Sequence, residues 1–331
     1  MRKKFPCWEL CRKVLFFVKI PFCRVDRSAA IRSILRSSPA EIVLDFLWDA
    51  ALLRDLPMRK WILTHELIHQ RARSYRDAGV TPDFTVLDEA REVELLENAD
   101  GLIAIQDEDA AWMRGHFPTK QIVVLPPPCA RRKLPPPPAA PPSVLFIGGK
   151  TAHNRYGLEW LAGDVWPHVL SRLPDARLRI YGTVPCGGIA SSGSIEVKGP
   201  VAEVSSAYAE NQVAAVPFRF GSGLKIKLLE AMSIGLPAVA TPIGAQGFAD
   251  LRTGLVCPVY EDAPSFSDAL VRSLTDTPFR KEIVAKQDAW LKKNDRPGAF
   301  GHAVSQSYKG LDSCHSHFAS LPTKIRGSCA A

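Results

Sequence analysis

Short apolar runs alternate with segments of helical periodicity along the first 125 residues. Runs of this length, bounded by polar or turn-forming residues, are typical of buried strands. Because neighbouring parallel strands need crossover connections, usually helices, the alternation predicts a parallel α/β sheet. We expect strands at residues 41–45, 61–64, 101–105 and 121–125, and helices at residues 85–98 and 108–115.

The same alternation returns after a proline-rich stretch. Residues 126–142 hold so many prolines that no helix or strand survives there, which predicts a stiff interdomain linker, with a proline-recognition ligand as the alternative. The pattern predicts two Rossmann-like α/β domains, residues 1–125 and 143–295, and a partly disordered tail with one further helix at residues 296–331. In the second domain we expect strands at residues 143–147, 177–181, 194–197, 213–216 and 238–240, and helices at residues 157–170 and 201–210.

The composition narrows the choice of partners. With 46% hydrophobic and 23% charged residues in a chain of 331, the protein has the profile of a globular domain pair. A net charge of +8 favours nucleic acid, anionic lipid or phosphorylated small molecules. Since arginine-rich blocks interleaved with aromatic residues are absent, nucleic acid is the weakest of the three.

The cysteines and the first residues bear on localisation. Eight cysteines include no C-x-x-C pair, which favours reduced thiols in a cytoplasmic protein over a disulfide framework or a zinc ribbon. The basic start is followed by a short apolar stretch at residues 14–18, too short for a membrane span and without a signal-cleavage site. We interpret it as a peripheral helix or as a surface segment that touches a membrane.

The most informative segment of the chain is residues 219–245, a glycine-rich loop, a helix and a short apolar strand. Gly221 and Gly223 allow close backbone approach to a ligand, and the first amides of the helix then point toward it. Lys225 and Lys227 add positive charge, and Glu230 is placed to accept hydrogen bonds from vicinal hydroxyls such as those of a ribose. The alternative is an ordinary helix start in which Glu230 pairs with Lys227.

This segment also carries a family resemblance. The run GSGLKIKLLEAMSIGLPAVAT at residues 221–241, followed by GAQG at 244–247, resembles the donor-site motif of retaining GT-B glycosyltransferases, the group called glycosyl transferases group one. FIGGKTAHNRYGLEW at residues 146–160, with VWP at 165–167, is similar to the first loop and helix of that family's C-terminal domain. The resemblance implies two Rossmann-like domains facing each other across a cleft, with a nucleotide-sugar donor on the C-terminal domain and the acceptor on the N-terminal one.

By this resemblance Glu230 binds the ribose, while Lys227 and the amides of Gly223 and Leu224 hold the diphosphate. Further implied donor contacts are Lys225, Ser222, Gly149 and Asn154. Ser222 itself departs from the pattern, because many members have a second glutamate at its position. The N-terminal domain also lacks an opening strand and glycine loop before residue 40, so we expect this domain to be incomplete.

Residues 65–69 spell H-E-x-x-H, which on a helix could bind zinc. No third ligand pattern follows, and the strand expected at residues 61–64 places His65 at the carboxyl edge of the sheet instead. The resemblance makes His65 a cleft-facing catalytic residue close to the donor's sugar or phosphate; a structural histidine is the alternative.

We therefore expect a glycosyltransferase that moves a sugar, with retention, from a nucleotide-diphosphate donor to a saccharide or lipid-linked acceptor in polysaccharide or glycolipid biosynthesis. It would need no cofactor or metal and would bind no nucleic acid. Its expected location is the cytoplasm, with an anionic surface at the inner membrane face as a further partner. The alternative is a catalytically reduced relative that binds a nucleotide or a partner without turnover.

Overall fold

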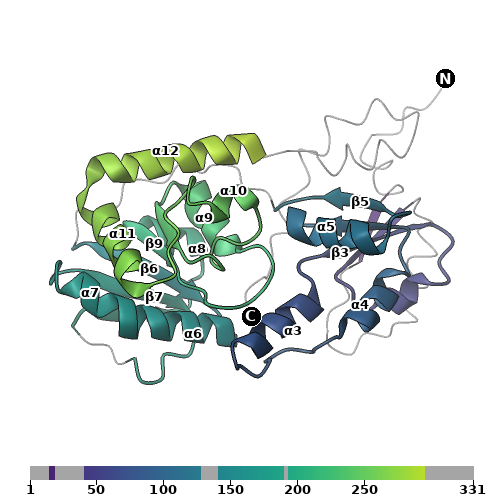
Figure 1. Cartoon of the computed structure of the whole chain (residues 1–331), viewed down its shortest axis with the longest axis horizontal. Coiled ribbons are helices and arrows are strands. Elements are labelled where there is room, and N and C mark those ends of the chain that lie inside the picture. The colour runs from purple at the N-terminus through teal and green to yellow at the C-terminus, as the bar shows by residue number, and fades with distance from the viewer. Residues whose placement is uncertain (1–14, 19–40, 128–140, 190–192, 295–331) are drawn as a thin grey trace. The chain divides into compact units, whose positions relative to one another are not determined.

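The computed structural model describes residues 15–18, 41–127, 141–189 and 193–294 (Figure 1). The contacts between its residues divide the chain into two compact units. Unit 1 comprises Met1–Ala72 and Val86–Pro126, and unit 2 comprises Arg73–Thr85 and Pro127–Ala331. Most of the expected linker and the whole expected tail lie outside the described residues.

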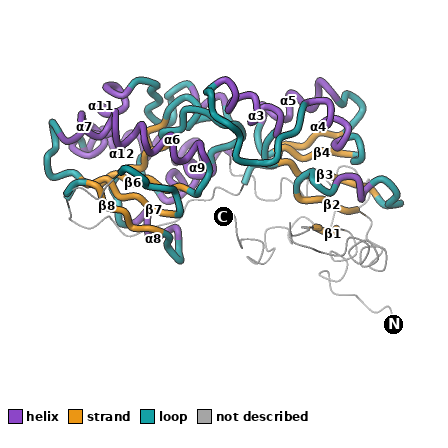
Figure 2. The backbone as a smooth tube through the Cα atoms, turned by 90° about the horizontal axis from the view of Figure 1, so that it is seen from below, coloured by secondary structure: helices purple, strands orange, loops and turns teal. Residues whose placement is uncertain are grey.

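Unit 1 is built on a sheet of five parallel strands. Their spatial order follows their order in the chain: β1 (Leu15–Val18), β2 (Glu41–Asp45), β3 (Arg59–Thr64), β4 (Gly101–Ala104) and β5 (Gln121–Val124). Because every connection steps in the same direction, right-handed crossovers place their helices on one face. Figure 2 shows α4 (Glu89–Leu96) and α5 (Asp107–His116) on the same side of this sheet. A short 3-10 helix, η1 (Ala50–Leu53), and the start of α3 (Ile68–Asp77) complete the described elements, and the part of α3 from Arg73 onward belongs to unit 2.

The expectation that no strand precedes residue 40 was wrong. The apolar run expected as a peripheral helix or surface segment forms strand β1, which pairs in parallel with β2 from Leu15↔Glu41 to Val18↔Leu44. A run of four apolar residues has no periodicity that separates strand from helix, so the neighbouring strand decides its conformation. The glycine loop remains absent from this part of the sequence, since the first glycine of the chain is Gly79.

Unit 2 contains the second parallel sheet, in the order β10-β9-β6-β7-β8. The chain starts at the central strand, proceeds to one edge and then returns to the other side of the first strand. The order therefore reverses between β6 and β9, which are hydrogen-bonded neighbours at Val144↔Val213 and Leu145↔Ala214. The strands are β6 (Ser143–Gly148), β7 (Arg177–Gly182), β8 (Ile195–Gly199), β9 (Val213–Val216) and β10 (Ala238–Ala240).

Helices cover both faces of this sheet, as the crossovers of a doubly wound sheet require. Figure 2 shows α6, α7 and α11 on one side and α8 on the other. Their apolar side chains, led by Trp166 and Phe266, pack with the β6, β7 and β9 strands into one core. The bounds are α6 (Ala152–Trp160), the π-helical turn η2 (Leu161–Val165), α7 (Trp166–Leu170), α8 (Val204–Ala209), α9 (Ile226–Ile234), α10 (Ala249–Arg252), α11 (Ala263–Thr275) and α12 (Thr277–Asn294).

The helix expected at residues 157–170 begins earlier than its pattern suggested, at Ala152. Gly157 interrupts the periodicity of this helix, and its presence has a steric cause. A Cβ at this position would come within 3.0 Å of the Pro217 carbonyl oxygen. The glycine therefore allows α6 to approach the loop after β9 closely, a requirement that only the folded structure reveals.

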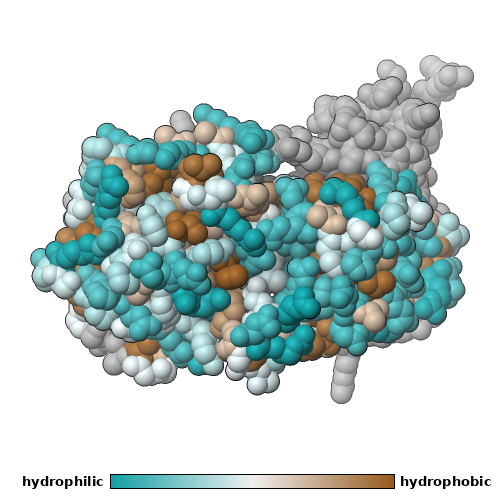
Figure 3. Space-filling model, in the orientation of Figure 1, coloured by the Kyte–Doolittle hydropathy of each residue, from teal (hydrophilic) through white to brown (hydrophobic). Residues whose placement is uncertain are grey.

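Among the described residues, no helix combines the length and apolar character required to cross a membrane. On the face drawn in Figure 3, hydrophilic side chains predominate and apolar ones form small separate groups. Cys186 and Cys257, the described cysteines, carry no disulfide.

Candidate functional site

The two loops singled out in the sequence lie at the point where the strand order of unit 2 reverses. One loop leads from β6 into α6 and contains Gly149; the other leads from β9 into α9 and contains Gly221 and Gly223. In open α/β sheets, ligands bind outside the carboxyl ends of the strands at such a switch point. The sheet topology thus brings the two sequence motifs to the position where a ligand is expected.

A direct hydrogen bond joins the two loops. The Lys227 ammonium donates to Asn154 Oδ1 at 2.6 Å, and the same ammonium lies 5.1 Å from the centroid of the Phe218 ring. Burial lowers the pKa of Lys227 to about 8, against the opposing effect of the Glu230 charge. Asn154 is buried in the first turn of α6, so it fixes the position of the ammonium.

Glu230 is oriented by a buried tyrosine. The Tyr208 hydroxyl lies 3.0 Å from Glu230 Oε2 and 3.3 Å from the carbonyl oxygen of Lys227. Burial, followed by the nearby Glu230 charge, raises the pKa of Tyr208 well above its usual value, so the phenol stays protonated and can donate. Both Lys227 and Glu230 therefore have a partner that holds their side chains in place.

The glycine loop before α9 is held by its own lysine. Gly221 has φ of +126°, a conformation that L side chains rarely adopt. The Lys225 ammonium, 8% exposed as a residue, donates to the carbonyls of Ser222 at 2.7 Å and Gly223 at 2.9 Å. No acceptor among the described residues binds the amides of Gly223 and Leu224, although both residues are buried. A buried amide without an acceptor is uncommon, so these two are suited to a ligand.

Three further contacts to these loops come from residues 73–85 of unit 2, which the sequence analysis missed. The Gly221 amide donates to Ser74 Oγ at 2.9 Å, and the Tyr75 hydroxyl lies 2.9 Å from His153 Nδ1. The Ala152 amide donates to the Asp83 carboxylate. No local signal marks these residues, because their partners lie far away in the sequence.

In unit 1, His65 follows β3 directly and lies at the carboxyl edge of the sheet, as expected. Its Nε2 is 2.6 Å from Oδ1 of Asp45, the last residue of the neighbouring strand β2. The histidine side chain is 42% exposed, whereas that of Asp45 is 21% exposed. Phe46, the next residue, has φ of +73° and is the non-glycine residue with positive φ in the described part of the chain. A carboxylate that holds an accessible imidazole can support proton transfer.

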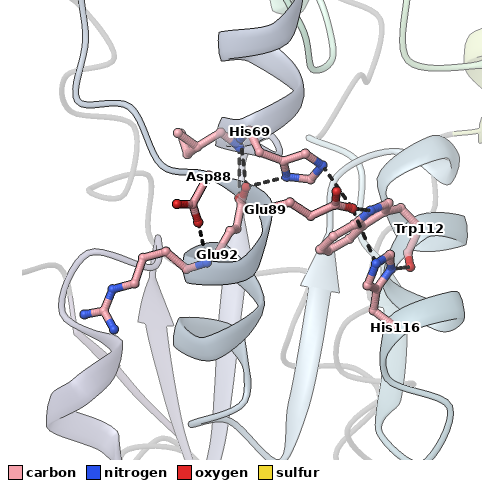
Figure 4. A network of polar contacts seen from close by, with 8 residues as sticks. His69, Asp88, Glu89, Glu92, Trp112 and His116 are labelled. Atoms are coloured by element: carbon pink, nitrogen blue, oxygen red, sulfur yellow. Dashed lines mark hydrogen bonds and ion pairs between the residues drawn. The ribbon is translucent and has the colours of Figure 1, made fainter.

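The H-E-x-x-H residues do not share a helix face. His65 precedes α3, whereas His69 lies in its first turn, and His69 Nδ1 is 2.7 Å from Glu92 Oε2. Figure 4 shows His69 pointing toward Glu92 and Glu89, with Trp112 and His116 beyond. Within the described residues, no group of three or more His, Cys, Asp and Glu side chains could hold a metal ion.

Glu92 is fully buried and accepts the amides of Ile68 and His69, each at 2.9 Å, in addition to the imidazole. It therefore caps the N-terminus of α3 from outside the helix. Nearby, burial raises the pKa of Asp109 to about 7, although a hydrogen bond from Gln106 at 2.6 Å opposes the shift. The charges of Glu66, Glu108 and Glu92 add to the rise.

The chain is similar in sequence or in structure to several known proteins. An uncharacterized 44.6 kDa protein in the cps region of Klebsiella pneumoniae is 26% identical over 164 residues, which cover 46% of this chain and 42% of that protein. The structure of an S. aureus TarM mutant in complex with Fondaparinux, alpha-GlcNAc-glycerol and UDP is similar with a TM-score of 0.64 and 13% identity, covering 85% of this chain and 58% of TarM. Sucrose-phosphate synthase from Thermosynechococcus elongatus also has a TM-score of 0.64, with 17% identity, covering 86% of this chain and 77% of the synthase.

This chain therefore spans about half the length of the Klebsiella and S. aureus proteins. The structural likeness shows the fold alone: the Rossmann-like α/β units are similar to those of GT-B glycosyltransferases. The family model described as Glycosyl transferases group 1 matches residues 141–276, which run from the start of β6 to the end of α11 and include every candidate donor residue. Over this segment, the chain is similar to the glycosyl transferases group 1 family.

Proposed function

We propose that this protein is a glycosyltransferase that moves a sugar from a nucleoside diphosphate donor to a saccharide or lipid-linked acceptor, with retention, in polysaccharide or glycolipid biosynthesis. The observation that carries the proposal is the bond between Lys227 and Asn154 at the switch point of unit 2. The bond joins the start of α6, after β6, to the start of α9 through a cation on the same helix as Glu230, which supports a shared anion site there.

In this proposal the diphosphate lies at the N-terminus of α9. The amides of Gly223 and Leu224 donate to phosphate oxygens, and the helix start contributes its partial positive charge. The Lys227 ammonium stabilises the negative charge that grows on the leaving diphosphate as the bond to the sugar breaks. Glu230, held by Tyr208, accepts hydrogen bonds from the ribose hydroxyls. These groups supply the electrostatic part of the reaction without a dedicated cofactor.

The acceptor hydroxyl is assigned to unit 1 in this proposal. His65, held by Asp45, provides a nitrogen that can exchange a proton or a hydrogen bond with a sugar hydroxyl. The TarM complex with UDP and alpha-GlcNAc-glycerol supports a nucleotide donor and a sugar-bearing acceptor for a protein of this fold. The cps-region relative supports a role in polysaccharide biosynthesis.

Ser222 motivates the second candidate, a protein that binds the nucleotide without turnover. In the motif that this segment resembles, many members have a glutamate at this position, where it contacts the donor sugar. In this chain the position holds Ser222, and its carbonyl oxygen accepts a hydrogen bond from the Lys225 ammonium. Both candidates share the nucleotide site, so binding and turnover must be measured separately.

The test is a thermal-shift screen of the full chain with uridine, guanosine and adenosine diphosphates and their glucose, galactose and N-acetylglucosamine conjugates. A ligand at about 100 times its Kd stabilises the folded state by about 2.7 kcal/mol. We expect this stabilisation with one nucleotide series and its loss in Glu230→Ala. Glu282→Ala, which removes an exposed carboxylate on α12, is the matched control and should bind as the wild type does.

Release of nucleoside diphosphate in the presence of oligosaccharide or lipid-linked acceptors then separates the two candidates. Acceptor-dependent release establishes transfer, and the anomeric configuration of the product establishes retention. Binding without release on any acceptor favours the second candidate. A wild-type protein that none of the nucleotides stabilises would refute the donor site.

A further inference from the structure

We infer that residues 73–85, which we call the brace, position both donor loops and so determine how tightly the diphosphate binds. In the sequence, the brace lies well before β6, the first strand of the second sheet. Its contacts nevertheless group it with unit 2. It makes one contact to the glycine loop through Ser74, one to the first turn of α6 through Asp83, and one to each through Tyr75. The inference rests on the proposed donor site.

Ser74 fixes the conformation of the glycine loop. The amide of Gly221 donates to Ser74 Oγ at 2.9 Å, at the residue whose φ of +126° turns the chain toward Gly223 and Leu224. This bond commits the Gly221 amide to the protein, while the amides of Gly223 and Leu224 have no acceptor among the described residues and are left for a ligand. Without the serine hydroxyl, the Gly221 amide would lose its partner and the glycine-rich loop would gain conformational freedom.

Tyr75 connects the two loops. Its ring is fully buried and packs edge-on against Phe220 of the glycine loop, with centroids 4.7 Å apart. Its hydroxyl lies 2.9 Å from Nδ1 of His153, in the first turn of α6. Val80, Phe84 and Ala152 complete this small apolar cluster. One side chain thereby ties the loop after β9 to the helix after β6.

Asp83 caps α6 from outside the helix. The N-cap residue Thr151 provides no side-chain cap, and the Ala152 amide donates to Asp83 instead. The cap holds the turn that carries Asn154, and Asn154 in turn holds the Lys227 ammonium. The Asp83 carboxylate also occupies the positive end of α6, so the N-terminus of α9 and Lys227 are left to bind the anionic ligand.

The contacts imply a positioning role, because none of the three brace side chains needs to touch the ligand. Preorganised amides bind phosphate more tightly than amides that must first be ordered, since the ordering entropy is then already lost. Loosening the brace should therefore raise the Kd of the diphosphate and the KM of the donor, while kcat and the folded structure are retained.

The experiment measures binding of uridine, guanosine and adenosine diphosphates and of pyrophosphate to the full chain by calorimetry. We expect Ser74→Ala and Tyr75→Phe each to raise the Kd of the nucleotide that the wild type binds best, and of pyrophosphate, by about tenfold. Ser74→Thr keeps the hydroxyl and should restore binding. Asp83→Asn keeps a capping side chain and should bind more tightly than Asp83→Ala.

Ser171→Ala and Tyr260→Phe alter exposed side chains of unit 2 away from the brace and should bind as the wild type does. Circular dichroism melting of every variant shows whether the fold is retained, and Tyr75→Phe keeps the buried ring. If the wild type binds a nucleotide and the folded Ser74→Ala and Tyr75→Phe variants bind it equally well, the brace inference is wrong while the donor site stands. If the wild type binds none of the probes, the donor site and the inference both fail.

Discussion

Lys227 Nζ and Asn154 Oδ1 lie 2.6 Å apart although 73 positions separate the two residues in the sequence. The bond is possible because β6 and β9 are neighbours, so the loops that follow them share one edge of the sheet. Burial around this bond leaves Lys227 with a pKa of about 8, low enough for its charge to change within a measurable pH range.

The affinity for a nucleoside diphosphate should therefore fall as the pH rises above about 8. The folded state releases the Lys227 proton near this pH, and a neutral amine no longer attracts the diphosphate. We expect Kd to rise by up to about tenfold per pH unit between pH 8 and 10, measured by calorimetry at constant ionic strength. Lys227→Arg is the control: guanidinium stays charged over this range, so its Kd should depend much less on pH. An equally steep rise in Lys227→Arg would assign the titration to another group.

His65→Ala should reduce turnover on the order of 10² to 10⁴-fold without weakening nucleotide binding, because His65 is proposed to act on the acceptor side. Asp45→Asn should reduce turnover less, since the imidazole remains but its carboxylate partner is lost. Steady-state rates of diphosphate release, together with calorimetric Kd values, test both statements. His116→Ala removes an exposed histidine of the same unit and should leave both quantities unchanged. Full activity in His65→Ala would support the structural interpretation of this residue.

Glu92→Ala should destabilise the protein by about 3 kcal/mol or more. The buried carboxylate accepts the amides of Ile68 and His69 and the His69 imidazole, and its removal leaves three donors without their acceptor. Urea denaturation followed by circular dichroism measures the loss. Glu94→Ala, at an exposed position of the same helix, should cost less than about 1 kcal/mol. Equal effects of the two substitutions would contradict the capping role of Glu92.

Asp109 should make the protein less stable as the pH rises from about 4 to 7. Its folded-state pKa of about 7 exceeds the ordinary value of 3.8, so over this range the folded state binds more protons than the unfolded state. The contribution of Asp109 to the free energy of unfolding is full below pH 4 and is lost as the pH passes 7. Its magnitude is on the order of 1 to 4 kcal/mol. Asp109→Asn should flatten this slope in urea denaturation at pH 5 and pH 8. Asp175→Asn, at an exposed position, should keep the wild-type slope.

Local patterns in the sequence predicted much of the fold. Nine of the ten described strands coincide with the ranges that short apolar runs or alternating patterns predicted. The run at Leu15–Val18 was misjudged, because four apolar residues become a strand only when a neighbour such as β2 is available for pairing. Helix α3 was also missed, since its apolar stripe is narrow, with Ile68, Ala72 and Tyr75 buried among mostly polar residues.

The candidate site also has a part that the sequence predicted and a part that it did not. The glycine-rich loop, Lys227 and Glu230 are adjacent in the chain, and their spacing on a helix start was sufficient to predict a phosphate and ribose site. Tyr208 and the brace residues were not predictable, because they come from other loops and helices. Asn154 was implied by the resemblance, but its bond to Lys227 was not. Asp45 is similar, because it meets His65 only through the pairing of β2 with β3.

The sequence by itself thus determined the α/β class, the order of strands along the chain and the chemical groups near the helix start of α9. The tertiary structure alone decided the spatial order of the strands, the partners that orient Lys227, Glu230 and His65, and the burial that lowers the pKa of Lys227 and raises that of Asp109. The physical reason is the separation along the chain between the residues that determine each property. Backbone conformation and helix spacing depend on near neighbours in the chain, whereas hydrogen-bond partners and desolvation depend on which distant segments the fold brings together.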